Sequence, residues 1–220
     1  MARRGPVITI DGPVGAGKSA VSQRVAERLG LPFVDSGLLY RAVAWLALER
    51  GVALTDPAAL AALAELPRLQ IVGDRVLDGD RDLTTFVHQP EINWNLSAVS
   101  SQPEVREAIN RKLRQLAGGG VVMAGRDIGT VVFPDADWKF FLTASLEERV
   151  RRRAAQFQRR GEPADQASMT QEVGDRDRAD SERSVAPLKP APDAVVIDTD
   201  GVPLDEVVDQ IVATVRRSSR

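Results

Sequence analysis

The sequence predicts an α/β fold in which a parallel sheet is covered by helices on both faces. Short apolar runs, typical of buried strands, alternate along the chain with longer segments whose apolar residues recur at helical spacing. Strands that alternate with helices pair in parallel through right-handed crossovers. With 220 residues, of which 43% are hydrophobic and 27% charged, the chain can bury the core of one globular domain.

Five strands and five main helices follow from these patterns. The strands are expected at residues 7–10, 32–34, 121–124, 138–142 and 195–198. The helices are expected at residues 18–29, 38–50, 103–116, 146–158 and 204–216. Strands this short and this apolar indicate a sheet buried on both faces. We therefore expect a five-stranded parallel sheet between two helical layers, a three-layer arrangement.

Residues 55–102 interrupt the alternation of strands and helices. They predict a helix at 57–66 and then short strands at 68–72 and 75–77, joined by a turn at Gly73-Asp74. We interpret this stretch as an insertion on the substrate side of the sheet.

Residues 151–183 form a second exception, dense in charge and poor in large apolar side chains. Gly161-Glu162-Pro163 divides the stretch, which predicts two helices joined by a mobile turn. Such a segment suits a lid that closes over phosphates. The alternative is a solvated helical hairpin with no such role.

Composition excludes several classes of protein. There is no cysteine, and His88 is the single histidine, so neither disulfides nor a zinc site of cysteine and histidine is expected. We expect His88 to be structural. A net charge of −2 argues against a protein that coats nucleic acid. No apolar run approaches the ~20 residues of a membrane span, and residues 1–4 lead straight into a strand, so we expect a cytoplasmic protein with no membrane partner.

A phosphate-binding motif follows the first strand. Residues 12–19 read GPVGAGKS, the pattern G-x-x-x-x-G-K-[ST] of the P-loop. Its glycines let backbone N–H groups surround phosphate oxygens, Lys18 can neutralise the β- and γ-phosphates, and the Ser19 hydroxyl can ligate a Mg²⁺ ion that bridges them. The alternative is a glycine-rich turn with an incidental lysine. We predict that ATP binds to Gly12, Pro13, Val14, Gly15, Ala16, Gly17, Lys18, Ser19 and Ala20.

Polar residues also follow the second and third strands, at the carboxyl edge of the sheet where ligands of open α/β sheets bind. The second strand leads into DSGLLYR, whose Arg41 lies one turn into a helix and is expected to face the crevice. The alternative is that Ser36 caps this helix while Tyr40 packs inward. The third strand leads into Arg126 and Asp127, for which the alternative is a surface ion pair.

Five motifs in a fixed order carry a resemblance to a known family. GPVGAGKS, DSGLLYR, VREAINRKLR, AGRDIGTVVFPDA and RSVAPLKPAPDA together resemble bacterial cytidylate kinases, and the similarity covers essentially the whole chain. The resemblance implies a P-loop fold and transfer of the γ-phosphate of ATP to CMP or dCMP, which yields CDP or dCDP and ADP in pyrimidine nucleotide metabolism. It also implies small-molecule substrates and Mg²⁺ with ATP; we further expect a monomer.

The same resemblance assigns roles to individual residues. Arg41, Arg126 and Arg183 are expected to hold the CMP phosphate and, with Lys18, to form the catalytic set. Ser36, Ser97, Arg106 and Asp127 are expected to read the cytosine, with Tyr40 beside them. Arg176 and Asp180 are expected to hold the sugar, and Arg152 and Arg153 to close on the triphosphate.

The expected organisation is a single P-loop kinase domain over residues 1–220. Its core comprises about residues 1–37, 103–150 and 184–220, its nucleoside-monophosphate-binding insertion about residues 38–102, and its lid about residues 151–183. Arg111 and Arg114, on the same expected helix as Arg106, are either surface cations or further pocket residues.

Two alternatives to CMP phosphorylation remain. A related P-loop kinase of another small acceptor, such as AMP, UMP or shikimate, would keep Lys18 and the lid arginines but change the pocket around Ser97, Arg106 and Asp127. A non-catalytic ATP sensor would need the P-loop but no second arginine cluster.

Overall fold

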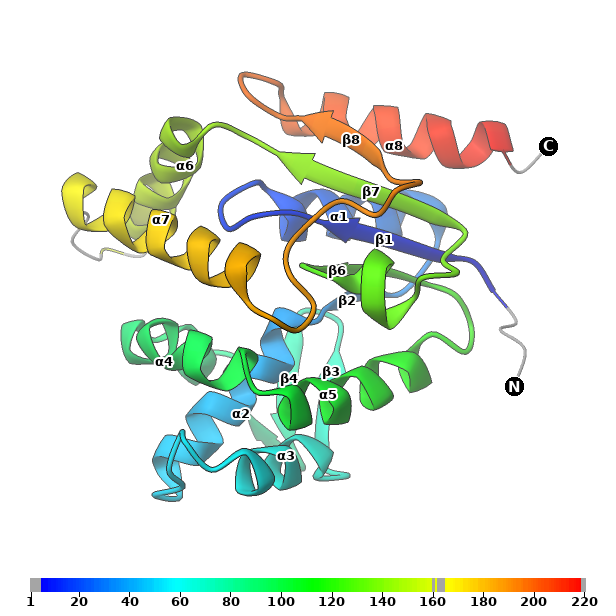
Figure 1. The fold of residues 1–220 in the computed structure, drawn as a ribbon. Coiled ribbons are helices and arrows are strands. Elements are labelled where there is room, and N and C mark those ends of the chain that lie inside the picture. Colours follow the sequence, from blue (N-terminus) through cyan, green and yellow to red (C-terminus); the bar gives the residue numbers. More distant parts are fainter. Residues whose placement is uncertain (1–4, 160, 162–164, 219–220) are drawn as a thin grey trace.

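The computed structural model describes residues 5–159, 161 and 165–218, and its central element is a five-stranded parallel sheet (Figure 1). The strands are β1 (Val7–Asp11), β2 (Phe33–Asp35), β6 (Val121–Gly125), β7 (Trp138–Thr143) and β8 (Val195–Asp198). They lie in the order β2-β6-β1-β7-β8. The predicted α/β class and all five predicted strands are confirmed.

The register of the sheet brings three strand ends to one edge. Asp11 of β1 pairs with Gly125 of β6, and Asp35 of β2 pairs with Ala124. Since these strands are parallel, the segments that follow each of them leave from the same edge. The P-loop, the segment after Asp35 and the segment after Gly125 are therefore neighbours.

Helices cover both faces of the sheet. One face packs Ile8, Ile10 and Phe140 against α1 (Lys18–Leu29) and α8 (Leu204–Ser218). The opposite face, which includes Val7, Val34, Val121 and Met123, packs against α2 (Gly37–Glu49) and α5 (Pro103–Leu116). Alternate residues of β1 and β6 thus serve two separate apolar clusters, and the three-layer prediction is confirmed.

The insertion forms the lower part of the molecule in Figure 1. It contains α3 (Pro57–Glu65), a small antiparallel sheet of β3 (Leu69–Val72), β4 (Arg75–Asp78) and β5 (Arg81–Asp82), a 3-10 turn η1 (Phe86–His88) and α4 (Pro90–Ser100). The sequence predicted α3, β3 and β4. It did not predict β5 or α4, although Ile92, Leu96 and Val99 of α4 are buried at helical spacing.

The segment expected to form a lid, about residues 151–183, contains most of α6 (Leu146–Arg159) and all of α7 (Gln166–Glu182). They pack against each other, and α7 passes above α4 in Figure 1. Most of the turn expected at Gly161-Glu162-Pro163 lies outside the described residues. Over the described part of the chain, no helix combines the length and apolarity that crossing a membrane requires.

Candidate active site

A cleft of about 690 Å³ lies at the carboxyl edge of the sheet, between the P-loop, the insertion and the lid. Most of the predicted site residues line it together. They are Val14, Gly15, Ala16, Gly17, Lys18, Ser19, Ala20, Ser36, Tyr40, Arg41, Arg106, Arg126, Asp127, Arg152, Arg153, Arg176 and Arg183. Four predicted residues, Gly12, Pro13, Ser97 and Asp180, are absent from this lining. The fold therefore gathers predicted residues from separate segments of the chain around one cleft.

The P-loop is shaped by close packing as well as by its own conformation. A Cβ atom on Gly12 would lie 2.1 Å from the Leu142 carbonyl oxygen, and Gly17, just before α1, has a φ of 86°. Lys18 is buried and its Nζ atom donates a 2.6 Å hydrogen bond to the Pro13 carbonyl. Burial lowers its pKa well below the usual value, and Arg126 lowers it further. The ammonium is thus poorly solvated and favours an anionic partner.

Ser19 lies beside a carboxylate. Its hydroxyl donates a 2.6 Å hydrogen bond to Asp35 Oδ2, while Asp35 Oδ1 accepts the Gly37 N–H at 2.9 Å. Both Ser19 and Asp35 line the cleft. Oxygen ligands of this kind fit Mg²⁺, which also takes ligands from substrate phosphates. Asp35 ends β2 and was not predicted as a site residue.

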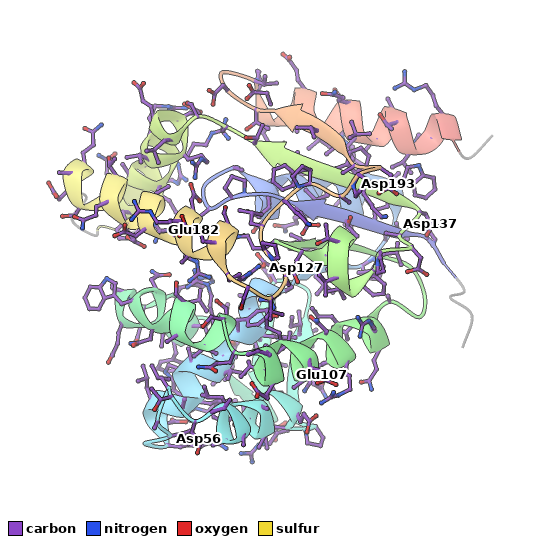
Figure 2. All side chains as sticks on the ribbon, in the orientation of Figure 1. Asp56, Glu107, Asp127, Asp137, Glu182 and Asp193 are labelled. Atoms are coloured by element: carbon purple, nitrogen blue, oxygen red, sulfur yellow. The ribbon has the colours of Figure 1, made fainter. Side chains whose placement is uncertain are left out.

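Arg106 and Asp127 form a buried ion pair at the insertion side of the cleft. Their side chains are 3% and 6% exposed, and Arg106 Nη2 lies 2.5 Å from Asp127 Oδ2. Arg106 also donates to the Ser100 carbonyl and lies 5.4 Å from the centre of the Tyr40 ring. Figure 2 labels Asp127 near the middle of the molecule. Because Asp127 pairs with Arg106 and not with its neighbour Arg126, the alternative of a surface pair of adjacent residues is not observed.

Asp180 contacts three arginines: Arg126, which is distant in sequence, and Arg176 and Arg183, which lie within four residues of it. Arg126 Nε, Arg176 Nε and Arg183 Nη1 lie 2.9, 3.3 and 3.5 Å from its carboxylate oxygens. Burial opposes ionisation of Asp180, but the three arginines outweigh it and lower the pKa of this carboxyl. In this structure Asp180 therefore holds three arginines in place. A hydrogen bond to a sugar would come in addition to these contacts.

Arg183 contacts the Arg106–Asp127 ion pair, whereas Arg41 is held by other residues. Its Nη2 atom is 3.8 Å from Asp127 Oδ1, and its Nε donates to the Ala186 carbonyl at 2.7 Å. Arg41 is instead anchored by the insertion, since its Nη1 donates to Asn93 Oδ1 at 2.6 Å and to the Val87 carbonyl. Burial lowers the pKa of Arg41 to about 10. The three arginines expected at the phosphate are thus held by different partners, Asn93 for Arg41 and Asp180 for Arg126 and Arg183.

Two predicted serines hydrogen-bond to protein groups. The Ser36 hydroxyl donates to the Ala124 carbonyl at 2.9 Å and makes no side-chain hydrogen bond that caps α2, whereas Tyr40 packs into the core as that alternative expected. Ser97, on α4, accepts a 3.1 Å hydrogen bond from Arg176 and lines an adjoining cavity of about 580 Å³. Ser97 therefore lies outside the lining of the main cleft, next to the arginine expected at the sugar.

The lid arginines are paired with glutamates. Arg152 donates to Glu148 at 2.7 Å and to the Thr199 carbonyl at 2.6 Å, while Arg153 lies 2.5 Å from Glu172. Hydrogen bonds from Arg151 and then Arg152 hold the pKa of Glu148 at about 2. Both lid arginines therefore already have a carboxylate partner in this structure.

Sequence comparison relates the chain that forms this cleft to a known family. The sequence profile of the cytidylate kinase family matches residues 8–217. This chain belongs to that family. It is 47% identical over 209 residues to the cytidylate kinase of Exiguobacterium sp., covering 93% of each chain. It is 44% identical over 210 residues to the cytidylate kinase of Desulfitobacterium hafniense, covering 94% of this chain and 90% of that one.

Other relatives of the cytidylate kinase family are longer or more distant. The chain is 44% identical over 223 residues to the bifunctional pantoate ligase/cytidylate kinase of Synechococcus elongatus, of which it spans 42%. Among solved structures, an uncharacterized protein from Eubacterium ventriosum matches with a TM-score of 0.54 at 16% identity, over 98% of this chain and 99% of that one. The latter match supports the fold alone.

In this member of the cytidylate kinase family, a buried carboxylate that holds the segment after Asp127 was not predicted. Asp11, at the end of β1, is buried and accepts the N–H groups of Ile128 at 2.9 Å and Gly129 at 2.8 Å, which open a π-helical turn at Ile128–Val132. Burial raises its pKa to about 6, against the effect of these N–H groups. The sequence offered one indication of this role, namely that Asp11 is an acidic residue at the end of an apolar strand.

The wall of the cleft beyond the P-loop was missed entirely. It is formed by Thr199, Gly201, Val202, Pro203 and Leu204, which carry no motif. In contrast, Arg111 and Arg114 are absent from the lining: Arg111 pairs with Glu65 and Glu107, and Arg114 donates to the carbonyls of Val131 and Val132.

Proposed function

We propose that this chain transfers the γ-phosphate of ATP to CMP or dCMP, giving ADP and CDP or dCDP. One observation carries the proposal: a single cleft runs from Lys18 in the P-loop to the buried Arg106–Asp127 pair. A cleft with a triphosphate cradle at one end and a polar, base-sized corner at the other suits two nucleotides bound end to end. Family membership supports the same reaction.

The chemistry asks the protein to align two anions and to offset their repulsion. The attacking oxygen belongs to a phosphate that is already ionised at neutral pH, so no general base is required. In this proposal Lys18 contacts the triphosphate, and Arg41 and Arg126, which line the same cleft, contact the acceptor phosphate. Arg183, 3.8 Å from Asp127, lies where it can contact either the phosphate or the base.

Recognition of cytosine is assigned to the Arg106–Asp127 side of the cleft. Cytosine presents an exocyclic amine beside ring acceptors, so a carboxylate can accept from the amine while a guanidinium or hydroxyl donates to the acceptors. Asp127, Arg106 and Ser36 supply these groups within the cleft. Ser97 joins them in this proposal through Arg176, which it contacts, and Arg176 and Asp180 are assigned to the sugar.

Magnesium would be held by Ser19 together with the phosphates of ATP. The described residues contain no group of three acidic or histidine side chains able to hold a metal alone, which suits an ion that arrives with its nucleotide. When bound, Mg²⁺ would neutralise charge on the phosphates of ATP. We also propose that the protein is a cytoplasmic monomer. Its partners are these small molecules, and it binds neither nucleic acid nor membranes.

Product analysis with a panel of acceptors tests the proposal. The purified chain with Mg²⁺ and ATP is given CMP, dCMP, UMP, AMP or shikimate, and ADP formation is measured for each. We expect CMP and dCMP to be the best substrates. Turnover of AMP equal to that of CMP would remove the cytosine assignment. Transfer of labelled phosphate from ATP to CMP in a single turnover separates a kinase from an ATP sensor, which would bind ATP without forming labelled CDP.

A further inference from the structure

A buried arginine of the lid connects the P-loop to the second lid helix. Arg149, on α6, has a side chain only 8% exposed. Its Nε donates to the Ala144 carbonyl at 3.0 Å, and its Nη1 donates to the Val14 carbonyl of the P-loop at 3.1 Å. The same Nη1 lies 2.5 Å from Asp177 Oδ2 on α7. One guanidinium therefore contacts three segments of the chain.

Asp177 has little else to pair with. Its second carboxylate oxygen is buried and has no hydrogen-bond partner among the described residues. Its neighbour Arg176 and, one turn later, Asp180 belong to the acceptor side of the cleft. The residue that α7 uses to contact Arg149 thus lies within the same turn as residues assigned to CMP.

Apolar contacts strengthen the same junction. Val14 packs against a small cluster of Val150, Met169 and Val173, which lies between α6 and α7. A Cβ atom on Gly15 would lie 2.9 Å from the Arg149 Cβ, so the P-loop backbone and α6 are in close contact. The P-loop at Val14 and Gly15 is therefore packed directly against α6 and its partner helix.

We propose that Arg149 and Asp177 are a pair of positioning residues that fix α7 against the P-loop and so couple the ATP site to the CMP site. An occupied P-loop holds the Val14 carbonyl in place, Arg149 bridges that carbonyl to Asp177, and Asp177 sets the position of Arg176 and Asp180. This inference rests on the proposed function for the identity of the acceptor. The pair itself contacts neither substrate in the proposal.

Hydrogen exchange tests the coupling without any acceptor. A non-hydrolysable ATP analogue with Mg²⁺ is added to the wild type and to Asp177→Asn, and amide exchange is followed by mass spectrometry. In the wild type we expect slower exchange in α1 and in α7. In Asp177→Asn we expect α1 to be protected as before and α7 to lose most of its protection. Equal protection of α7 in both proteins, or none in the wild type, would overturn the proposal.

Binding of CMP supplies the second measurement. We expect the analogue to raise the affinity of the wild type for CMP by about five-fold or more, a typical coupling between sites, and to raise that of Asp177→Asn less than two-fold. Asp177→Glu keeps the charge and is expected to recover part of the effect, which separates lost coupling from damage to the fold. Equal coupling in the wild type and Asp177→Asn would contradict the proposal. A protein that fails to bind CMP but shows the expected exchange pattern would refute the proposed acceptor and leave the junction supported.

Arg178→Gln is the matched control. Arg178 lies on α7 next to Asp177, but its contact with Asp175 is 3.8 Å long and its side chain is 68% exposed. Its removal is expected to leave both the exchange pattern and the coupling unchanged. Equal losses in Arg178→Gln and Asp177→Asn would reduce the effect to a general loosening of α7 and so refute a specific role for the Arg149–Asp177 pair.

Discussion

The Arg106–Asp127 corner and the lid arginines are both built from arginine–carboxylate pairs, yet they differ in burial and in partners. Arg106 and Asp127 come from the core, on α5 and just after β6, and their side chains are at most 6% exposed. Arg152 and Arg153 are 24% and 11% exposed and pair with glutamates that are themselves 15% and 35% exposed. The Arg106–Asp127 pair is therefore a fixed part of the fold. The arginines of the lid pairs can exchange their glutamates for another anion.

The difference separates recognition from closure. A buried ion pair is costly to break, because the remaining charge stays desolvated, so the corner keeps its geometry with or without substrate. The lid pairs are less buried than the corner, so a phosphate can replace their carboxylates at lower cost. We infer that the corner is preorganised to select the base, whereas the lid arginines are recruited on binding.

Lys18, in the P-loop, is the residue whose substitution is expected to lower activity most. We expect Lys18→Ala to lower kcat by about 10³-fold or more, the scale found for cations that stabilise transferring phosphate, with an unchanged circular dichroism spectrum. Steady-state kinetics with ATP and CMP provides the measurement. The exposed Lys189 offers the control, and Lys189→Ala should match the wild type. Equal activity of Lys18→Ala and the wild type would contradict the assigned role.

Asp127→Asn tests whether the corner is both structural and selective. Loss of the charge leaves Arg106 buried without its counterion, so the free energy of unfolding should fall by about 3 kcal/mol. We expect KM for CMP to rise by about 100-fold while KM for ATP changes little, since a hydrogen-bonded charged group is lost from the acceptor side alone. Urea denaturation and two-substrate kinetics measure the two effects.

Glu107→Gln is the comparison for this variant. Glu107 lies on α5 one residue from Arg106, is 73% exposed and pairs with Arg111 (Figure 2). Its loss should cost less than about 1 kcal/mol and leave KM for CMP unchanged. If Asp127→Asn still discriminates CMP from UMP and AMP as the wild type does, Asp127 does not read the base.

Asp11 makes the free energy of unfolding depend on pH. Its pKa is raised from 3.8 in the unfolded chain to about 6 in the folded protein, chiefly by burial, so between these values the folded state binds more protons. The contribution of Asp11 to stability is therefore largest at low pH and falls as pH rises from about 4 to about 6, by about 3 kcal/mol in all. Asp11→Asn removes this titration. The free energy of unfolding of the variant minus that of the wild type should rise by this amount between pH 4 and pH 7, and parallel pH profiles would exclude the effect.

The contrast between Lys18 and Asp11 shows how far the sequence could be read. The strands and the main helices follow from apolar spacing, and the P-loop around Lys18 follows from a motif whose chemistry is local. The roles of the arginines that line the cleft came from the family resemblance, and the wall at residues 199–204 carried no signal. Asp11 acts by accepting N–H groups from Ile128 and Gly129, more than a hundred positions away. Asn93 likewise anchors Arg41 from a helix that was not predicted. Contacts of this kind depend on tertiary packing, which leaves no periodic signal in a single sequence.

The lid provides the smallest effect. Glu172→Gln frees Arg153 from a carboxylate 2.5 Å away, so Arg153 is available to the triphosphate without an exchange of partners. We expect KM for ATP to fall by about two- to five-fold at low ionic strength, which corresponds to a pair worth up to about 1 kcal/mol. Added salt should reduce this difference because it screens partly exposed charges. Glu182→Gln, at the other end of the same helix (Figure 2), should leave KM for ATP unchanged. A rise of KM in Glu172→Gln would mean that the glutamate orients Arg153 for ATP and does not compete with it, and the distinction between a fixed corner and an exchangeable lid would then fail.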